Sequence, residues 1–170
     1  MSLISVQAVL KTALDGYHTP LMDTYNIKPF NCYIAPPQVV TDTLTAPEVY
    51  IWGGKADTHR GTAPRSIKHT GGFKISPWKF DIWVFFIDSI VAGGDNVSFP
   101  AILDGIRRAI EDIPYPQTLT DNDSEPTQTQ LVMVAEDLDL EQPPPTMLED
   151  QSNLLHTAHI MCAMREDYQA

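Results

Sequence analysis

The sequence has few cysteines and few basic residues, and each shortage argues against a class of protein. Cys32 and Cys162 stand far apart and outside any C-x-x-C spacing, so free thiols in a reducing compartment are expected rather than a disulfide or zinc framework. Lys and Arg number 11 against 22 Asp and Glu, a net charge of −11. We therefore do not expect nucleic-acid binding as the main role, because affinity for the phosphate backbone comes from Lys and Arg. The same acidity also serves solubility alone.

Long apolar runs are absent as well. The longest, Ile82–Ile87, is far shorter than the roughly 20 residues that a membrane-spanning helix needs. No basic segment precedes an apolar stretch at the N-terminus, so no signal peptide is indicated. We therefore expect a cytoplasmic chain without a membrane partner. Its 170 residues, 43% of them hydrophobic, suit one domain over residues 1–170.

Two amphipathic helices are predicted from apolar residues at helical spacing. The first spans Leu3–Leu14, with Gly16 placed to stop it. The second spans Ser98–Ile113, and Pro114 ends it. Between Pro20 and Pro37, frequent prolines leave room for a turn of helix and a short extended piece.

Strands are predicted from alternating and β-branched segments. One covers Glu48–Trp52 and ends at Gly53-Gly54, and a longer one runs from Phe73 to about Asp88. The second half of the longer strand is apolar on both faces, which is typical of a central, buried strand. Two more are expected at Thr129–Ala135 and from Leu154 to about Glu166, joined by a Pro-rich link at residues 141–147.

This element order predicts an α+β fold. We expect a mostly antiparallel or mixed sheet of about four to five strands, with two helices packed on one face. A long basic loop is expected between two of the strands.

Motifs for catalysis or cofactors do not emerge from the sequence. The glycine pairs lack the frames of phosphate-binding loops, and no nucleophile stands in a recognisable setting. Carboxylate pairs such as Asp137 and Asp139 suit a solvated surface. The best metal candidate is His156-x-x-His159-x-x-Cys162, whose side chains would share one side of a helix. On a strand, His159 would point away from the other two and the site would vanish. We expect no metal, no cofactor and no enzymatic activity.

The clearest asymmetry is electrostatic. Six of the 11 basic residues lie between Lys55 and Lys79, against the single acid Asp57, whereas from Glu111 onward Arg165 is the only base. Residues 55–72 contain one large apolar side chain, Ile67, so they are expected to project as a loop. This loop either binds something negative or is merely a flexible tip.

The layout resembles the tail-terminator proteins of long-tailed phages and, more loosely, the related head–tail joining and neck proteins. The resemblance rests on element order: the helix Leu3–Leu14, the strand Glu48–Trp52, the basic arm Lys55–Gly72, the aromatic strand Trp78–Asp88 and the helix Ser98–Ile113. The strands near Leu131 and Ile160 complete it.

The resemblance implies a structural virion protein that forms a ring, usually of six copies, at the end of the tail tube. Such a ring stops tail growth and offers the docking face for the head. The implied partners are further copies, the tail-tube protein and the head–tail connector, with DNA passing through the bore without specific binding. The implied location is the tail or neck of the virion, after assembly in the host cytoplasm. The basic residues of and beside the arm are the expected subunit or tail-tube interface: Lys55, Arg60, Arg65, Lys68 and Lys74.

Two other classes remain open. A head-completion or minor capsid protein would share the absence of catalysis but differ in symmetry and partner. A small metal-dependent hydrolase would use His156, His159 and Cys162.

Overall fold

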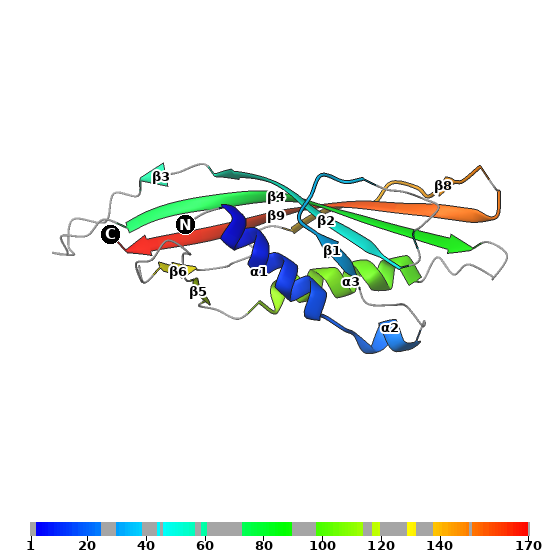
Figure 1. Cartoon of the computed structure of the whole chain (residues 1–170), viewed down its shortest axis with the longest axis horizontal. Helices are drawn as coiled ribbons and strands as arrows, with labels where there is room; N and C mark the ends of the chain where they lie inside the picture. Colours follow the sequence, from blue (N-terminus) through cyan, green and yellow to red (C-terminus); the bar gives the residue numbers. More distant parts are fainter. Residues whose placement is uncertain are drawn as a thin grey trace.

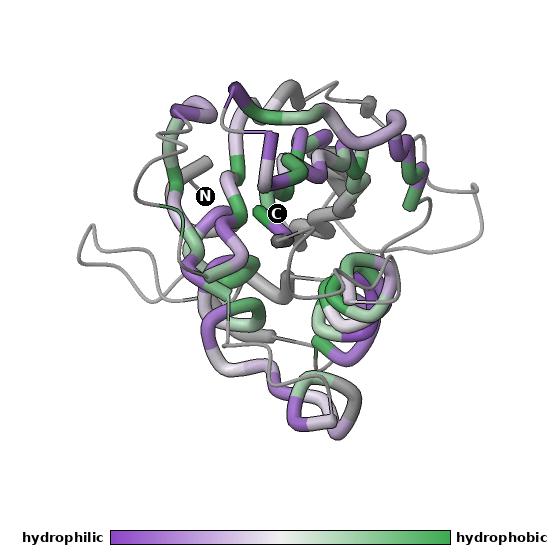
Figure 2. The backbone as a smooth tube through the Cα atoms, turned by 90° about the vertical axis from the view of Figure 1, so that its right-hand side faces the viewer, coloured by the Kyte–Doolittle hydropathy of each residue, from purple (hydrophilic) through white to green (hydrophobic). Residues whose placement is uncertain are grey.

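A long, mixed β-sheet with helices on one face forms the fold (Figure 1). The computed structural model describes residues 3–24, 30–38, 44, 46–56, 59–60, 73–89, 98–113, 117–119, 129–131, 138–149 and 151–169. Seen end-on, the helices lie below the sheet (Figure 2). We call the face of the sheet away from the helices the outer face.

Five strands form the continuous path of the sheet, in the order β1-β2-β4-β9-β7. Only β1 and β2 pair in parallel; the other neighbours are antiparallel. Short strands β3 and β8 pair with β4 and β9, and β5 and β6 form a separate two-stranded sheet. The bounds are β1 Asn31–Tyr33, β2 Glu48–Ala56, β3 His59–Arg60, β4 Phe73–Ser89, β5 Gln117–Leu119, β6 Thr129–Leu131, β7 Leu138–Glu141, β8 Thr146–Met147 and β9 Asn153–Gln169.

Strands β4 and β9 are the longest strands that the structure describes. Each has 17 residues, and they pair without a register shift from Phe73 opposite Gln169 to Ser89 opposite Asn153. At about 3.3 Å per residue, the pair is roughly 55 Å long. Strand β4 lies in the middle of the strand order, as the sequence predicted for its apolar run.

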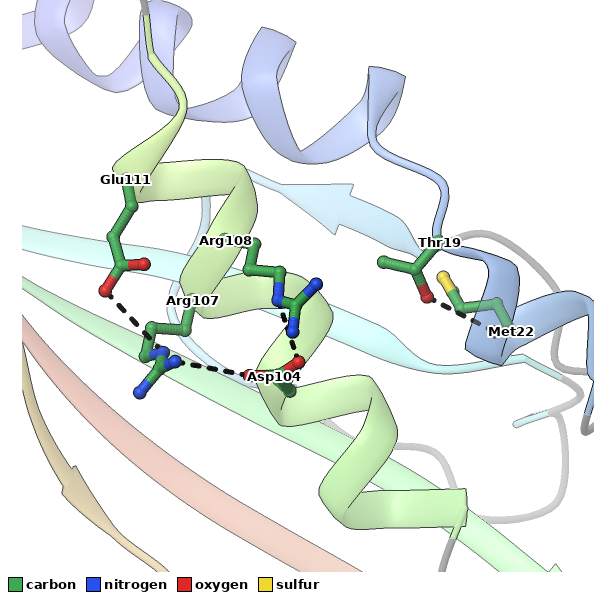
Figure 3. Close-up of polar contacts among 6 residues, drawn as sticks. All are labelled: Thr19, Met22, Asp104, Arg107, Arg108 and Glu111. Carbon is green, nitrogen blue, oxygen red and sulfur yellow. Dashed lines mark hydrogen bonds and ion pairs between the residues drawn. The ribbon is translucent and has the colours of Figure 1, made fainter.

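The helices of the described residues lie on the other side of the sheet: α1 Leu3–Gly16, α2 Pro20–Thr24 and α3 Ser98–Glu111. The short α2 packs on α3, farther from the sheet than the other two (Figure 2). The short α2 starts with a cap, because the Met22 amide donates a 3.2 Å hydrogen bond to the Thr19 hydroxyl (Figure 3). Among the described residues, no helix is long and apolar enough to cross a bilayer.

Helix α3 is strongly amphipathic. Phe99, Ile102 and Ile106 recur at helical spacing and are almost fully buried. The solvent side carries ion pairs that tie its two arginines: Arg108 Nε lies 2.9 Å from Asp104 Oδ2, and Arg107 lies 3.4 Å from Asp104 and 3.6 Å from Glu111 (Figure 3).

The core lies between the helices and the sheet. From the strands it takes alternate residues, so β9 contributes His156, Ala158, Ile160 and Cys162, all buried. This alternation is the one predicted for the closing strand. From the helices it takes apolar residues of all three: Val9, Leu10, Leu14, Met22, Phe99, Ile102, Leu103, Ile106, Ala109 and Ile110.

The α+β class, the mixed sheet and the two long helices on one face are confirmed. The glycine pair does not end its strand, because β2 continues through it to Ala56. The predicted basic loop 55–72 is wrong at its start, since Lys55, Ala56, His59 and Arg60 belong to strands. Residues 57–58 and 61–72 lie outside the described residues. Of the predicted strand Thr129–Ala135, the structure describes Thr129–Leu131, which form β6; the rest lies outside the described residues.

Candidate functional site: the outer face of the sheet

Four strands contribute a row of alternating apolar and acidic residues to the outer face. Trp52 of β2 is the register partner of Asp81 in β4; Asp81 is opposite Met161 of β9, and Met161 is opposite Asp139 of β7. Trp52 is 49% exposed and Met161 47% exposed. Large apolar side chains at this exposure, set between carboxylates, are suited to contact with another molecule. We call these four residues the mixed row.

A second row, two residues along each strand, is largely aromatic. The register joins Tyr33, Tyr50, Trp83, His159 and Glu141 across five strands. The rings of Tyr33 and Tyr50 have centroids 5.2 Å apart, and those of Trp83 and His159 stack at 4.4 Å. Phe85 connects the two pairs, with ring centroids 5.9 Å from Tyr50 and 6.4 Å from Trp83, and both Tyr50 and Phe85 are buried. The aromatic rings therefore form one connected cluster beside the mixed row.

A hydrogen bond joins the two rows. His159 Nε2 lies 2.8 Å from Asp81 Oδ1; an ionised carboxylate only accepts, so the imidazole N–H donates. The His159 side chain is 19% exposed and that of Asp81 46% exposed. An Asp–His pair can orient an imidazole that activates a nucleophile. The cysteine of β9, Cys162, is not in reach of this imidazole, because it lies on the opposite face of the sheet.

The glycine pair in β2 shapes this face through a bulge. The register of β2 against β4 shifts at Gly53 and Gly54, whose φ angles are 81° and 137°. A side chain at Gly53 would place its Cβ 3.3 Å from Asp81 Oδ2. The Gly53 carbonyl instead accepts a 3.0 Å hydrogen bond from the side-chain amide of Gln7 in α1. Glycine is therefore needed both for the backbone angle and for the room that Asp81 occupies.

A pocket of about 930 Å³ spans the strands from β2 to β7. Gly53 and Gly54 line it from β2, and Leu138 and Asp139 line it from β7. The strands between them contribute residues of both sheet faces: Lys79, Phe80, Asp81, Met161, Cys162 and Ala163.

Negative charge dominates the described outer face. Four carboxylates lie in the two rows or at the position next to them: Glu48, Asp81, Asp139 and Glu141. On the same face, Lys79 is the one Lys or Arg among the side chains that the structure describes. Burial, and then the 2.8 Å hydrogen bond to Glu48, raise the pKa of the Tyr50 hydroxyl above its usual value. Tyr50 therefore stays neutral, and the face keeps an excess of carboxylates.

The three candidate metal ligands do not converge. In strand β9, His156 and Cys162 are buried against the helices, while His159 belongs to the outer face. Burial raises the pKa of the Cys162 thiol to about 12 and lowers that of His156. Within the described ranges, no three His, Cys, Asp or Glu side chains are grouped as metal ligands.

The predicted interface residues lie partly together. Lys55, Arg60 and Lys74 belong to β2, β3 and β4 at the end of the sheet where β3 pairs with β4. Arg65 and Lys68 lie outside the described residues. The role of all five residues as an interface stays a prediction.

Sequence reasoning missed the mixed row. Strand β4 looked buried on both faces, yet Asp81 and Trp83 are only half-buried because the described helices all pack on the other face. An aspartate inside an apolar strand was the available signal. Asp139 was assigned correctly to the surface, but its alignment with Asp81 depends on register.

Comparisons with known proteins give a distant likeness. No protein-family model matches the chain, and no curated protein matches it. A chain from a solved structure described as "Virion of native gene transfer agent (GTA) particle" is similar over 97% of this chain and 95% of its own, with a TM-score of 0.43 and 14% identity. A likeness at this TM-score does not define a shared fold.

Proposed function

We propose that the chain is a structural virion protein that assembles with further copies into a ring at the end of a phage tail tube. The ring stops tail growth and provides the docking face for the head. One observation carries the assembly part of this proposal: the sheet has helices on one face, while its outer face presents Trp52 and Met161, each about half exposed, beside carboxylates. Large apolar side chains that stay half-exposed beside carboxylates are suited to burial against another copy of the chain.

The tail-terminator part rests on the order of elements. The pattern of the resemblance is a helix, a strand, a basic arm, an aromatic strand, a helix and two closing strands. Its helices and strands correspond in order to α1, β2, β4, α3, β6 and β9. The acidic composition supports a ring through which DNA slides, because a net charge of −11 repels the phosphate backbone.

Deleting the gene from the genome that encodes it tests this function. We expect tail tubes of uncontrolled length together with filled heads that have not joined a tail. Supplying the protein should restore tails of uniform length. Tails of normal length beside heads that lose their DNA would contradict the proposal and favour a head-completion protein.

A further inference from the structure

We propose that residues 140–147, which lead from β7 into β8 at the edge of the sheet, are a docking segment for a groove on a different protein of the virion. The groove is lined by aromatic rings and rimmed by Lys or Arg. The inference rests on the proposed role as a virion protein and names the kind of partner that this edge fits. We call residues 140–147 the docking segment.

Three consecutive prolines fix the backbone in the middle of the docking segment: Pro143, Pro144 and Pro145. Each proline ring holds its φ angle at about −65°, and each residue before a proline is restricted to extended ψ angles. Residues 142–144 all precede a proline, so the chain takes the polyproline II conformation there, and the structure shows neither helix nor strand over residues 142–145. Proline has no N–H group, so residues 143–145 donate no main-chain hydrogen bond to β9.

Strand β9 anchors both ends of this stretch. Glu141 ends β7 opposite His159, and Thr146 begins β8 opposite Leu155, so that β8 runs alongside the first part of β9 (Figure 1). The two anchor points on β9 are four residues apart, which is about 13 Å along a strand. Five steps of polyproline II from Glu141 to Thr146 reach about 16 Å. The stretch is therefore nearly straight, and little conformational freedom is left for it to lose on binding.

The docking segment presents apolar surface to solvent. Residues 142–145 are all exposed, Leu140 before them is 49% exposed, and Met147 after them is 58% exposed. The partners of Leu140 and Met147 in β9 are Ile160 and Leu154, an even number of positions apart, so both side chains lie on the same face of the sheet. Aromatic-lined grooves bind pre-formed polyproline II segments, and the two flanking side chains extend the apolar contact.

Charge defines the rim of the groove. Residues 138–149 contain three carboxylates, all exposed, and no Lys or Arg. A partner that carries Lys or Arg beside its aromatic rings complements this charge. The aromatic cluster on the outer face of a second copy is a poor fit, because Glu48 is hydrogen-bonded to Tyr50 there and Asp81 to His159. Carboxylates would face carboxylates in such a contact.

Two variants test the two properties of the docking segment. Pro143→Ala with Pro144→Ala and Pro145→Ala removes the rings and frees the backbone, whereas Glu141→Gln with Glu149→Gln removes charge and leaves the prolines in place. Circular dichroism and urea unfolding establish that each variant is folded.

Pro36→Ala with Pro37→Ala is the matched control. These two prolines are also consecutive and exposed, but they follow β1 at the opposite edge of the sheet.

Photo-crosslinking in assembled virions identifies the partner. The photoreactive residue benzoylphenylalanine replaces Pro144 in one preparation and Pro37 in another, and mass spectrometry locates the crosslinked peptides. From position 144 we expect crosslinks to a segment of another virion protein that contains aromatic and basic residues, and from position 37 no crosslink to that segment. Calorimetric titration of the full chain with that purified protein then gives the affinity. We expect the proline and glutamate variants to bind at least roughly tenfold more weakly, and the control like the wild type.

Several outcomes would overturn the inference. Position 144 crosslinks only to further copies of this chain, to a segment without aromatic residues, or to nothing. Alternatively, the proline variant binds the partner like the wild type and merely aggregates. That last result would leave protection of the sheet edge against pairing as the role of the prolines.

The proposed function fails separately. If position 144 crosslinks as expected but the gene deletion leaves tail length unchanged, the tail role is wrong and the docking segment stands. If neither variant loses binding while the gene deletion gives tails of uncontrolled length, the docking segment is wrong and the tail role stands.

Discussion

The side-chain amide of Gln7 in helix α1 donates a 3.0 Å hydrogen bond to the main-chain carbonyl of Gly53 in strand β2. This carbonyl lies at the register shift of β2 and is part-buried, and a polar main-chain group left without a partner in such a position costs free energy. Gln7 is itself 7% exposed, so both groups depend on this bond. One helix side chain therefore fixes the bulge that sets the shape of the outer face beside Asp81.

We expect Gln7→Leu to lower the free energy of unfolding by about 1–3 kcal/mol, because the Gly53 carbonyl loses its donor while the volume of the side chain is nearly kept. Urea unfolding measures the change. Gln38→Leu is the matched control, since Gln38 is exposed and contacts Tyr50 through its main-chain carbonyl. Equal stabilities of the Gln7 and Gln38 variants would show that the bond contributes nothing.

Gly53→Ala is expected to destabilise the protein by about 1–2 kcal/mol, because an L side chain is strained at a φ of 81°. Its Cβ would also meet Asp81 Oδ2 at 3.3 Å. Gly16→Ala at the end of α1 is the control, where a Cβ meets nothing within 4 Å; thermal unfolding of the two variants compares them. A Gly53 variant as stable as the Gly16 variant would contradict the strained bulge.

The glycine pair also shows where sequence-based prediction stops. Gly53-Gly54 after an alternating segment is equally consistent with a strand end and with a bulge. The choice depends on whether β4 offers partners beyond the pair, and it does, at Lys79 and Trp78. That information is non-local, so the local pattern predicted an end.

Periodicity predicted the long elements well because each has one buried face. Helix α3 and strand β9 show it, and the alternation in β9 correctly separated His159 from His156 and Cys162 once the segment was a strand.

Strand β7 was missed. Leu138–Glu141 has only four residues, most of them exposed, so it carries almost no apolar signal. The mixed row could not be predicted, since it requires the register of four strands.

The buried thiols provide a test of core integrity. Cys32 is 4% exposed and Cys162 1% exposed, and burial raises the pKa of each to about 12. The thiolate is the reactive form, so we expect both to resist a disulfide reagent at pH 8 and to react at once in denaturant. Thr12→Cys, which places a thiol on the exposed side of α1, should react promptly in the folded protein. Rapid labelling of either native thiol would show that the core opens there.

His156 should make stability depend on pH. It is 3% exposed, its ring lies 5.0 Å from that of Phe99 and 6.2 Å from that of Phe86, and among the described residues its Nε2 atom has no hydrogen-bond partner. Burial lowers its pKa, and the charge of Asp88 opposes this only in part. Folded His156 is therefore neutral at pH values where the unfolded side chain binds a proton.

The sign follows from proton linkage. Because the unfolded state binds more protons, the free energy of unfolding falls as the pH drops below the unfolded pKa of about 6.5 toward the lower folded value. Each unit of depression contributes about 1.4 kcal/mol, which is fully present above pH 6.5. We expect His156→Phe and His156→Leu to lose less stability than the wild type between pH 7.5 and pH 5, as measured by urea unfolding. Gln38→Leu, a change without a titrating group at an exposed site, should retain the wild-type slope. If the His156 variants keep the full pH dependence, the buried imidazole is not its source, and carboxylates that titrate at lower pH must account for it.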